Sequence, residues 1–446
     1  MSKILKIQPI TRLEGHGDVT IKLGPDFKVE DAQINVTSTR FFEKFFEGRP
    51  AEHAPRLAPR ICGICPIPHH LTAAKATEGA WGIWDKIPRP AYKLRELMIQ
   101  AKQVSSHVLH IAALQLPDLV FGPLAPPEKR NVVAIINAAP ELGKKVLWAM
   151  KWGQELCRAI GGKAVHPITA IPGGMSKPLD EDTRQKFLKD VPQLVEIGKE
   201  VVEIGDKLVN DYLDVITKYA VVPTFYIGLC KANGEHTIWE DDWQKKAHLR
   251  VMNKEGKIVE DRPSYEYKEF VGEYVSPHSM ATHVYHKQTG YPEGLWRANT
   301  LARLNVCDKM DSRTALAPEL FKKFRDVVGR PCHMTFAYIW ARIIETIAAV
   351  EIAANLLQDP EIVSTDVKLA DVMPKAGNLA GVSEAPRGTL IHEYWSDDKG
   401  IITKANMVVA TNHNIGGAEL SVKQAAIDIF EKKILDSVKL PEPMFK

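Results

Sequence analysis

The feature that most constrains this chain is a series of long segments with helical hydrophobic periodicity. One such segment carries apolar side chains at every third or fourth position: Leu94, Leu97, Met98, Ala101, Val104, Val108 and Ile111. The same pattern, with Pro, Gly and capping residues at the breaks, predicts helices over 132–160 (interrupted at Pro140), from Asp180 or Asp182 to about 219, over 321–357 (interrupted at 329–331) and over 419–435. Helices of this length bury their apolar stripes against one another. We therefore expect a mainly α (α+β) fold, with a long-helix bundle around a buried site.

Shorter segments predict β structure. Residues 4–35 alternate between apolar and polar side chains around Gly24-Pro25-Asp26, a pattern that predicts a hairpin. Residues 221–292 and 385–411 are rich in Gly, Pro, aromatic and β-branched residues, and predict short strands and loops at the periphery. No internal repeat or low-complexity linker is visible, so we expect one domain over residues 1–446.

Charge and hydropathy exclude several classes of protein. The net charge is +3 over 446 residues with no basic block, which argues against a nucleic-acid or anionic-membrane partner. The most apolar long stretch, 338–357, contains Arg342, Glu345 and Glu351 and is expected to be a buried helix, not a membrane span. Neither a signal-peptide pattern nor a disulfide framework is apparent among the 6 cysteines, which favours a reducing, cytoplasmic setting.

Cys62 and Cys65 form the one closely spaced cysteine pair. A C-x-x-C turn lets two thiolates converge on one soft or borderline metal such as nickel, zinc or iron. A helix is expected to begin near His69, and the partial positive charge at its start would favour thiolate over thiol. The pair alone leaves a redox or structural role open. The other cysteines (Cys157, Cys230, Cys307 and Cys332) are isolated and are expected to be small core residues.

The sequence motifs around this pair resemble those of the large subunits of nickel–iron hydrogenases. The matching strings, in family order, are Arg12-Leu13-Glu14-Gly15-His16, Arg40-Phe41-Phe42-Glu43 with Glu47-Gly48-Arg49, Arg60-Ile61-Cys62-Gly63-Ile64-Cys65 with His69, Gly161-Gly162, His166-Pro167, Gly173-Gly174, Ala302-Arg303-Leu304-Asn305, Glu384-Ala385-Pro386-Arg387-Gly388 and Val409-Ala410-Thr411-Asn412. The resemblance covers essentially the whole chain.

The resemblance implies roles for the residues around the cysteine pair. Cys62 would be a terminal nickel ligand, and Cys65 would bridge nickel to an iron that holds carbon monoxide and cyanide. His69 would hydrogen-bond the bridging sulfur. Glu14 would take the proton released when dihydrogen splits, because burial can raise the pKa of a carboxyl group to suit that role. The simpler alternative for Glu14 is an ion pair with a neighbouring arginine.

The resemblance also implies roles for residues on distant segments. Arg387 would overhang the open metal position with Asp118 as its carboxylate partner, although the two could equally be an ordinary buried ion pair. Pro386, Arg387 and Thr411 would cradle the cyanides.

Glu43 would bind magnesium, with the Met407 carbonyl as a companion, because magnesium prefers oxygen ligands. A surface role is the alternative for Glu43. His278, His283 and His286 fit no common metal-binding spacing, and we expect no metal there.

The family's second cysteine pair, in a D-P-C-x-x-C-x-x-H string, is absent from the 446 residues. Two thiolates are too few for a nickel–iron pair. The favoured explanation is a separate short peptide that supplies the second Cys or selenocysteine pair, as in the split viologen-reducing hydrogenases of methanogens. A truncated sequence, or a degenerate relative that has stopped using nickel, are the alternatives. A selenocysteine codon misread as stop is disfavoured, because the chain ends before the aspartate–proline step.

The resemblance thus implies a nickel–iron, or nickel–iron–selenium, hydrogenase large subunit that cleaves dihydrogen heterolytically and reversibly. Its expected partners are an iron–sulfur small subunit with [4Fe-4S] clusters, heterodisulfide reductase and an adaptor subunit between them. The alternatives are a degenerate subunit of a respiratory or sulfur-reducing complex, or a hydrogen sensor.

Overall fold

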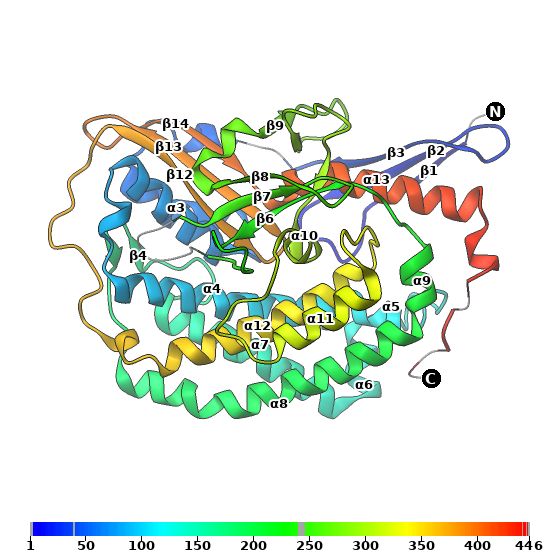
Figure 1. Cartoon of the computed structure of the whole chain (residues 1–446), viewed down its shortest axis with the longest axis horizontal. Coiled ribbons are helices and arrows are strands. Elements are labelled where there is room, and N and C mark those ends of the chain that lie inside the picture. The colour runs from blue at the N-terminus through cyan, green and yellow to red at the C-terminus, as the bar shows by residue number, and fades with distance from the viewer. Residues whose placement is uncertain (1–2, 39–40, 240–245, 439, 443, 445–446) are drawn as a thin grey trace.

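Four long helices form the base of the molecule in Figure 1. They are α4 (Arg89–Leu109), α7 (Pro140–Gly161), α8 (Glu181–Asp211) and α12 (Ala337–Gln358). Helix α4 packs on α7 and α12, and α12 packs on α8, so their apolar faces share one core. The computed structural model describes residues 3–38, 41–239, 246–438, 440–442 and 444. The predicted helix bundle is confirmed.

The helix ends follow the capping residues of the sequence. Asp180 precedes α8 and its side chain accepts the Thr183 N–H at 2.8 Å. Asn131 does the same for α6 (Val132–Ala138), accepting the Ala134 N–H at 3.0 Å. Pro140 begins α7 and Gly162, with φ of 78°, ends it. The predicted break at Pro140 is therefore confirmed.

Helix α4 does not end in a simple stop. Residues His110–Gln115 form a π-helical turn, and α5 (Leu116–Val120) continues from it. Such turns are rare and concentrate at functional sites, because the extra residue in the turn redirects the side chains that follow.

The sheet formed by β12 (Gly377–Ala385), β13 (Gly388–Ser396) and β14 (Ile402–Val408) covers helix α3 (Pro66–Ala80). Its strands are antiparallel, and Gly381 lies so close to α3 that a Cβ there would be 2.5 Å from the Thr72 carbonyl oxygen. Strand β13 is buried along almost its whole length. The expectation of peripheral strands is thus wrong for this sheet, because both of its faces are packed.

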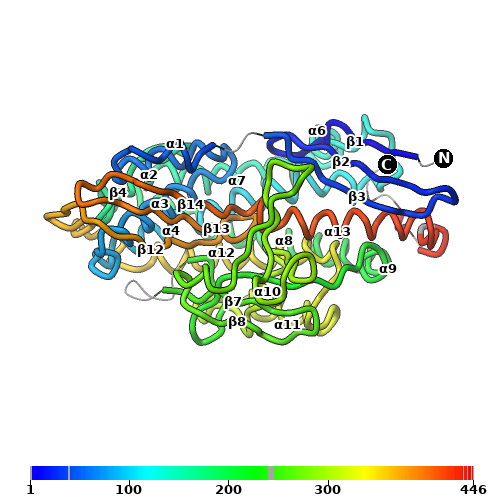
Figure 2. The backbone as a smooth tube through the Cα atoms, turned by 90° about the horizontal axis from the view of Figure 1, so that it is seen from above, coloured from blue at the N-terminus to red at the C-terminus, as the bar shows by residue number. Residues whose placement is uncertain are grey.

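The predicted N-terminal hairpin is present as β1 (Lys3–Ile7), β2 (Gly17–Leu23) and β3 (Val29–Val36). Helix α13 (Ala410–Phe430) lies along β3, as Figure 2 shows from above. It begins earlier than the predicted start at 419, because the Asn412 side chain accepts the Val409 N–H and supports the first turn.

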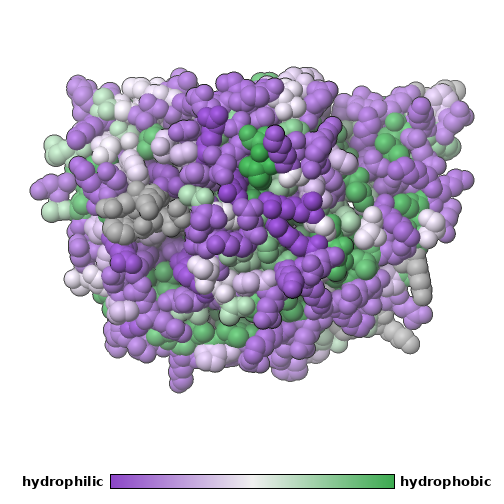
Figure 3. All heavy atoms as spheres, viewed as in Figure 1, coloured by the Kyte–Doolittle hydropathy of each residue, from purple (hydrophilic) through white to green (hydrophobic). Residues whose placement is uncertain are grey.

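The remaining elements connect these layers. A further sheet holds β11 (Trp296–Arg297), β6 (Phe225–Cys230), β7 (His248–Met252) and β8 (Ile258–Pro263) in that order, and the smaller strands are β4 (Ala170–Ile171), β5 (Gly174–Met175), β9 (Val271–Tyr274) and β10 (His283–His286). The shorter helices are α1 (Phe42–Phe46), α2 (Ala54–Leu57), α9 (Leu213–Lys218), α10 (Asn299–Val306) and α11 (Ala317–Val328). The face drawn in Figure 3 is mainly hydrophilic, with scattered apolar patches. None of the helices in the described part of the chain combines the length and the apolar character that a membrane span requires.

Candidate metal centre

Cys62 and Cys65 lie on a turn that leads directly into α3. Cys65 is the N-cap and Pro66 opens the helix, so the thiols lie at the positive end of the helix dipole. The Cys65 N–H donates to Cys62 Sγ at 3.3 Å. Both thiols are free and partly exposed. The turn therefore presents two sulfur ligands side by side.

The two thiols have different acidities. A hydrogen bond from the Cys65 thiol to the Cys62 sulfur lowers the pKa of the Cys62 thiol. The same hydrogen bond, together with burial, raises the pKa of Cys65 well above its usual range. Cys62 is therefore the thiol that deprotonates first when no metal is present.

Glu14 contacts this turn from the loop between β1 and β2. The Cys62 thiol donates to Glu14 Oε2 at 3.3 Å, and the Ile64 N–H donates to Oε1 at 3.2 Å. The structure thus places the predicted proton acceptor, Glu14, against Cys62, one of the two predicted nickel ligands. Glu14 is exposed, however, so the expectation of a buried carboxylate is wrong.

Arg387 approaches the cysteines from the loop between β12 and β13. Its Nη1 donates to Ser106 Oγ of α4 at 2.9 Å, and its Nη2 is buried without a hydrogen-bond partner among the described residues. Burial lowers the pKa of Arg387, and the nearby thiols of Cys65 and Cys62 oppose this effect. An unpaired guanidinium N–H of this kind is placed to donate to an anionic or lone-pair group beside the thiols.

A buried ionic network holds the Arg387 loop. Arg303 donates from Nε and Nη2 to the Glu345 carboxylate at 2.7 and 2.6 Å, and from Nη1 to Glu384 Oε2 at 2.6 Å. Arg342 donates from Nη1 to the Pro386 carbonyl at 3.4 Å. The paired arginine keeps the pKa of Glu345 well below its usual range despite burial. The motif strings include Arg303 and Glu384, but they give no role to Glu345 and Arg342 beside them.

Lys102 is a second residue that the sequence did not single out. It lies on α4, one helical turn before Ser106. Burial lowers its pKa, and the thiols of Cys157 and Cys65 raise it. Only its place on the apolar helix, among residues that face the core, could have pointed to it.

His69 lies on the first turns of α3 and is buried. Its Nδ1 is 3.1 Å from His392 Nε2, and His392 Nδ1 is 2.7 Å from the Tyr394 hydroxyl. Burial lowers the pKa of His69 to about 3, so its ring is neutral. A hydrogen bond to the bridging sulfur is not among the contacts of the described residues, and that role stays a prediction.

The first turn of α13 abuts the Arg387 loop. Asn414 Nδ2 donates to the Arg387 carbonyl at 2.8 Å, and Gly388, with φ of 144°, leaves room for Asn414 and Ala410. Thr411 belongs to this turn and is exposed, while Pro386 is buried. The elements that carry the three predicted cyanide-binding residues are therefore adjacent. Their contact with cyanide stays a prediction.

The predicted ion pair between Arg387 and Asp118 is wrong. Asp118 Oδ2 accepts from Arg12 at 2.7 Å and Oδ1 accepts from Arg130 at 3.2 Å. The π-helical turn before α5 redirects Asp118 toward the N-terminal loop, where Arg12 also donates to the Leu114 carbonyl. Asp118 instead fastens the loop that carries Glu14.

Glu43 and Met407 come together where α1 meets β14. The Met407 N–H donates to Glu43 Oε1 at 3.2 Å. Strand β14 is an edge strand, and the N–H and C=O of one residue point to the same side of a strand. The Met407 carbonyl therefore faces the Glu43 side, and an oxygen-rich magnesium site at this place is compatible with the geometry. Arg40 of the same string lies outside the described residues.

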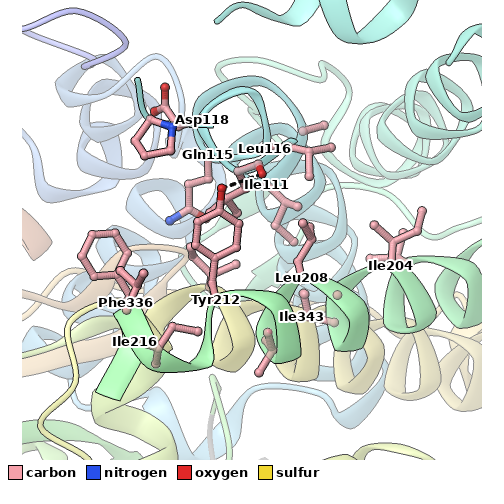
Figure 4. A pocket seen from close by; sticks show the side chains of 18 of the residues that line it. Ile111, Gln115, Leu116, Asp118, Ile204, Leu208, Tyr212, Ile216, Phe336 and Ile343 are labelled. Carbon is pink, nitrogen blue, oxygen red and sulfur yellow. Dashed lines mark hydrogen bonds between the residues drawn. The ribbon is translucent and has the colours of Figure 1, made fainter. Parts of the chain in front are cut away.

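An apolar cavity of about 320 Å³ lies between the π-helical turn, α8 and α12 (Figure 4). Val108 and Ile111 line one side, and Ile204, Leu208 and Ile343 line another. The Tyr212 hydroxyl at its wall donates to the Leu119 carbonyl at 2.9 Å, whereas Gln115 Oε1 in the same wall has no hydrogen-bond partner among the described residues.

The donor set fits a soft metal with anionic or lone-pair ligands. Two free thiols lie on one turn, and the Nη2 of nearby Arg387 is a donor without a partner among the described residues. The described residues offer no further cysteine at this turn, because the other free cysteines are buried in the core.

Comparisons with known proteins agree with this geometry. The family model for nickel-dependent hydrogenases matches residues 40–122, and a model described as HoxL-like matches residues 4–39. The vhu F420-non-reducing hydrogenase subunit of Methanocaldococcus jannaschii is 47% identical over 432 residues, covering 97% of this chain and 100% of that one. The F420-non-reducing hydrogenase subunit of Methanothermobacter marburgensis is 37% identical, covering 95% of this chain and 88% of that one. A crystal structure of an NAD+-reducing [NiFe]-hydrogenase in the H2-reduced state is similar with a TM-score of 0.87 and 31% identity, covering 96% of this chain and 97% of that one.

Proposed function

The chain belongs to the nickel-dependent hydrogenases, and from this premise we propose that Cys62, Cys65, Glu14 and Arg387 carry the reversible heterolytic cleavage of dihydrogen. The observation that carries the proposal is the contact between the Cys62 thiol and Glu14 Oε2 at 3.3 Å. Heterolytic cleavage requires a proton acceptor close to the metal ligands, because the proton must leave the metal while the electrons stay. The contact between Cys62 and Glu14 provides this arrangement.

Cys62 and Cys65 would hold the nickel–iron group, with Pro386, Arg387 and Thr411 around its carbon monoxide and cyanide ligands. When bound, this group would supply the overall conversion of dihydrogen into two protons and two electrons. The chain's own residues would hold Arg387 in position beside this group. The buried network under Glu384 and Pro386 fixes the loop that carries Arg387, and Ser106 orients one end of its guanidinium.

The proton would leave through Glu14. The Cys62 thiol already donates to this carboxylate, and Glu14 is exposed, so the next acceptor is water. The Ile64 N–H holds the second carboxylate oxygen and keeps the acceptor oriented.

Magnesium would bind between α1 and β14. Glu43 would supply a carboxylate oxygen and Met407 its carbonyl, with water completing the coordination. The support is the contact of Glu43 with the Met407 amide at 3.2 Å.

The electrons would leave through an iron–sulfur small subunit, because the described cysteines outside the turn are isolated and buried. Heterodisulfide reductase in the cytoplasm would follow, reached through an adaptor subunit. Support for this branch comes from the likeness to the subunits of F420-non-reducing hydrogenases.

A short separate peptide would supply the second pair of thiolate or selenolate ligands. The support is that Cys62 and Cys65 are both partly exposed, so another segment can reach them. Mass spectrometry of the purified complex should find a peptide of a few kilodaltons, and elemental analysis should find selenium if that pair includes selenocysteine. Nickel-loaded, active enzyme without such a peptide would contradict this assignment.

The catalytic proposal is tested with Cys65→Ser in the purified complex. We expect loss of nickel and of hydrogen uptake with viologen, because serine cannot act as a soft bridging ligand. Cys332→Ser is the matched control, since Cys332 is buried away from the turn near Asn305. Full hydrogen uptake by Cys65→Ser, or wild-type enzyme free of nickel, would end the proposal.

A further inference from the structure

Outside the hydrogenase centre, the described residues hold one other cluster of potential metal ligands. His278, His283 and Glu419 offer ligand atoms that all lie within 4.8 Å of one another. His278 Nε2 is 2.6 Å from Glu419 Oε1, and His283 Nε2 is 3.7 Å from Glu419 Oε2. The cluster joins β10 and the loop before it to α13, which lies far away in the sequence.

The His283 ring gives an independent sign that something is missing from this cluster. Its side chain is 1% exposed, and its Nε2 is buried without a hydrogen-bond partner among the described residues. The distance of 3.7 Å to Glu419 Oε2 is too long for a hydrogen bond. A ring nitrogen without a partner costs free energy in a buried place. A cation between His283 Nε2 and Glu419 Oε2 would supply the missing partner.

We propose that His278, His283 and Glu419 form a second metal site that binds a borderline divalent transition metal such as Zn²⁺. Two imidazoles and one carboxylate are a ligand set that zinc accepts, with a fourth position left for water. Ligand atoms around a tetrahedral zinc with bonds of roughly 2.0–2.1 Å lie about 3.3 Å apart. The pair of His283 and Glu419 is near this spacing, and the His278–Glu419 hydrogen bond opens as the metal replaces its proton.

Polar groups already support the three ligands. The Tyr291 hydroxyl is 3.3 Å from His283 Nδ1, and Ser276 Oγ is 3.2 Å from Nδ1 and 3.3 Å from Nε2 of His278. The Ile34 N–H donates to Glu419 Oε1 at 2.9 Å. Groups of this kind fix the orientation of metal ligands, and here they are present before any metal binds.

The fold explains why the sequence concealed this site. His286, the third histidine of the segment, is not a member: its Nδ1 is 2.7 Å from Thr289 Oγ1 and its ring stacks on Phe225. The third ligand comes from α13 instead. Gly416 lets α13 approach the strand, since a Cβ there would be 2.5 Å from Leu295 and 3.5 Å from the His283 ring. Glu419 lies one turn further along and points at the histidines. A bound metal thus links the N-terminal sheet, the β10 segment and α13.

Zinc binding by the purified complex tests the site. The complex is stripped with a chelator, dialysed against Zn²⁺ alone and analysed for zinc per chain, with X-ray absorption at the zinc edge. We expect one zinc in a shell of nitrogen and oxygen at about 2.0–2.1 Å, without the sulfur shell near about 2.3 Å that zinc on Cys62 and Cys65 would give. The presence or absence of sulfur around zinc therefore distinguishes binding at this cluster from binding at Cys62 and Cys65, so this proposal can fail independently of the proposed hydrogenase function.

Glu419→Gln is the first variant, because its amide oxygen still accepts the Ile34 N–H while its charge is lost. We expect zinc affinity to fall at least about 100-fold. His278→Gln, at a more exposed position, serves if the first variant fails to fold, and the expected loss is the same. His248→Gln is the matched control, since His248 pairs with Asp261 away from the cluster and should leave zinc binding unchanged. Wild-type affinity in either cluster variant, or zinc found only in a sulfur shell, overturns the proposal.

Discussion

The contact between Cys62 and Glu14 predicts that a substitution of Glu14 lowers hydrogen turnover without lowering nickel content. Glu14→Gln keeps an oxygen that can accept the Ile64 N–H, so the turn should keep its shape. The amide cannot take a proton from the thiol. We expect hydrogen uptake with viologen to fall about 10²- to 10⁴-fold, the usual contribution of a positioned proton acceptor. Nickel content should stay at the wild-type level.

Glu30→Gln is the control for that experiment, because Glu30 is an exposed carboxylate on β3. Wild-type turnover in Glu14→Gln would show that the proton leaves by another route. Loss of nickel in the same variant would instead assign Glu14 a structural role at the turn.

The burial of His413 predicts that the folded state loses stability at acidic pH. Its ring is buried against Trp296, neither nitrogen has a hydrogen-bond partner among the described residues, and burial lowers its pKa to about 3. Its folded pKa lies below the value of about 6.5 in the unfolded chain, so the unfolded state binds the proton first. The contribution of neutral His413 to the free energy of unfolding is therefore fully present above about pH 6.5, and it is lost as the pH decreases toward 3. The loss is about 2 kcal/mol at about pH 5.

His413→Phe should remove this contribution, since phenylalanine can stack on Trp296 but does not titrate. The drop in the thermal midpoint between about pH 7.5 and pH 5 should be smaller in the variant than in the wild type. His248→Phe should leave the drop nearly unchanged, because the His248 ring is partly exposed and paired with Asp261. Identical acid sensitivity in all three proteins would rule out this account of His413.

At the level of elements, the packing of β12 on α3 positions the cysteine turn. A Cβ at Gly381 would be 2.5 Å from the Thr72 carbonyl oxygen and 2.6 Å from the Ala76 nitrogen, and neither backbone atom can move freely. Gly381→Ala should destabilise the protein by about 1–3 kcal/mol through overpacking. It should also lower nickel occupancy, because α3 carries Cys65 at its start.

Gly24→Ala is the matched control in thermal unfolding. A Cβ at Gly24 would meet only the flexible Glu30 carboxylate, at 2.7 Å, so the cost should be small. Equal thermal midpoints for the two variants would mean that the β12–α3 contact is more compliant than its distances indicate.

The elements also show what sequence can and cannot predict. The helices of the base were predictable because their apolar stripes and caps, such as Asp180 and Pro140, are local signals. Helix α13 was predicted to start late, since Gly416 and Gly417 resemble a loop locally, although they make room for Leu295 and Arg297. The strands of the β12–β14 sheet were expected at the surface because burial on both faces has no local period.

For the candidate site, the cysteine turn, Glu14 and Arg387 were identified from strings of residues that the structure brings together. The partner of Asp118 was not predictable, because a π-helical turn rotates the side chains beyond it. Glu419 was missed for a similar reason: its two histidine neighbours come from a segment well over a hundred residues earlier, and only the packing of α13 brings them together.

At the scale of the whole molecule, the hydrogenase centre and the proposed zinc site share helix α13 and the N-terminal sheet. The start of α13 abuts the Arg387 loop, and Glu419 lies further along the same helix. The N-terminal sheet contributes Glu14 to one centre, through the loop after β1, and the Ile34 amide to the other. A metal in the second site would therefore restrain the two elements that border the first.

The cavity beside α8 and α12 is an apolar space inside the protein in which nonpolar molecules can dissolve. An apolar space of this kind binds xenon and other nonpolar gases more favourably than water does. Crystals pressurised with xenon should show it between Ile204, Leu208 and Ile343, and an empty cavity under xenon would exclude this use of the space. Val108 of its lining lies on the same helix as Ser106, which holds Arg387. A sparingly soluble reactant would thus be enriched inside the protein by partition, and its supply would depend on its solubility in the cavity as well as on its concentration outside.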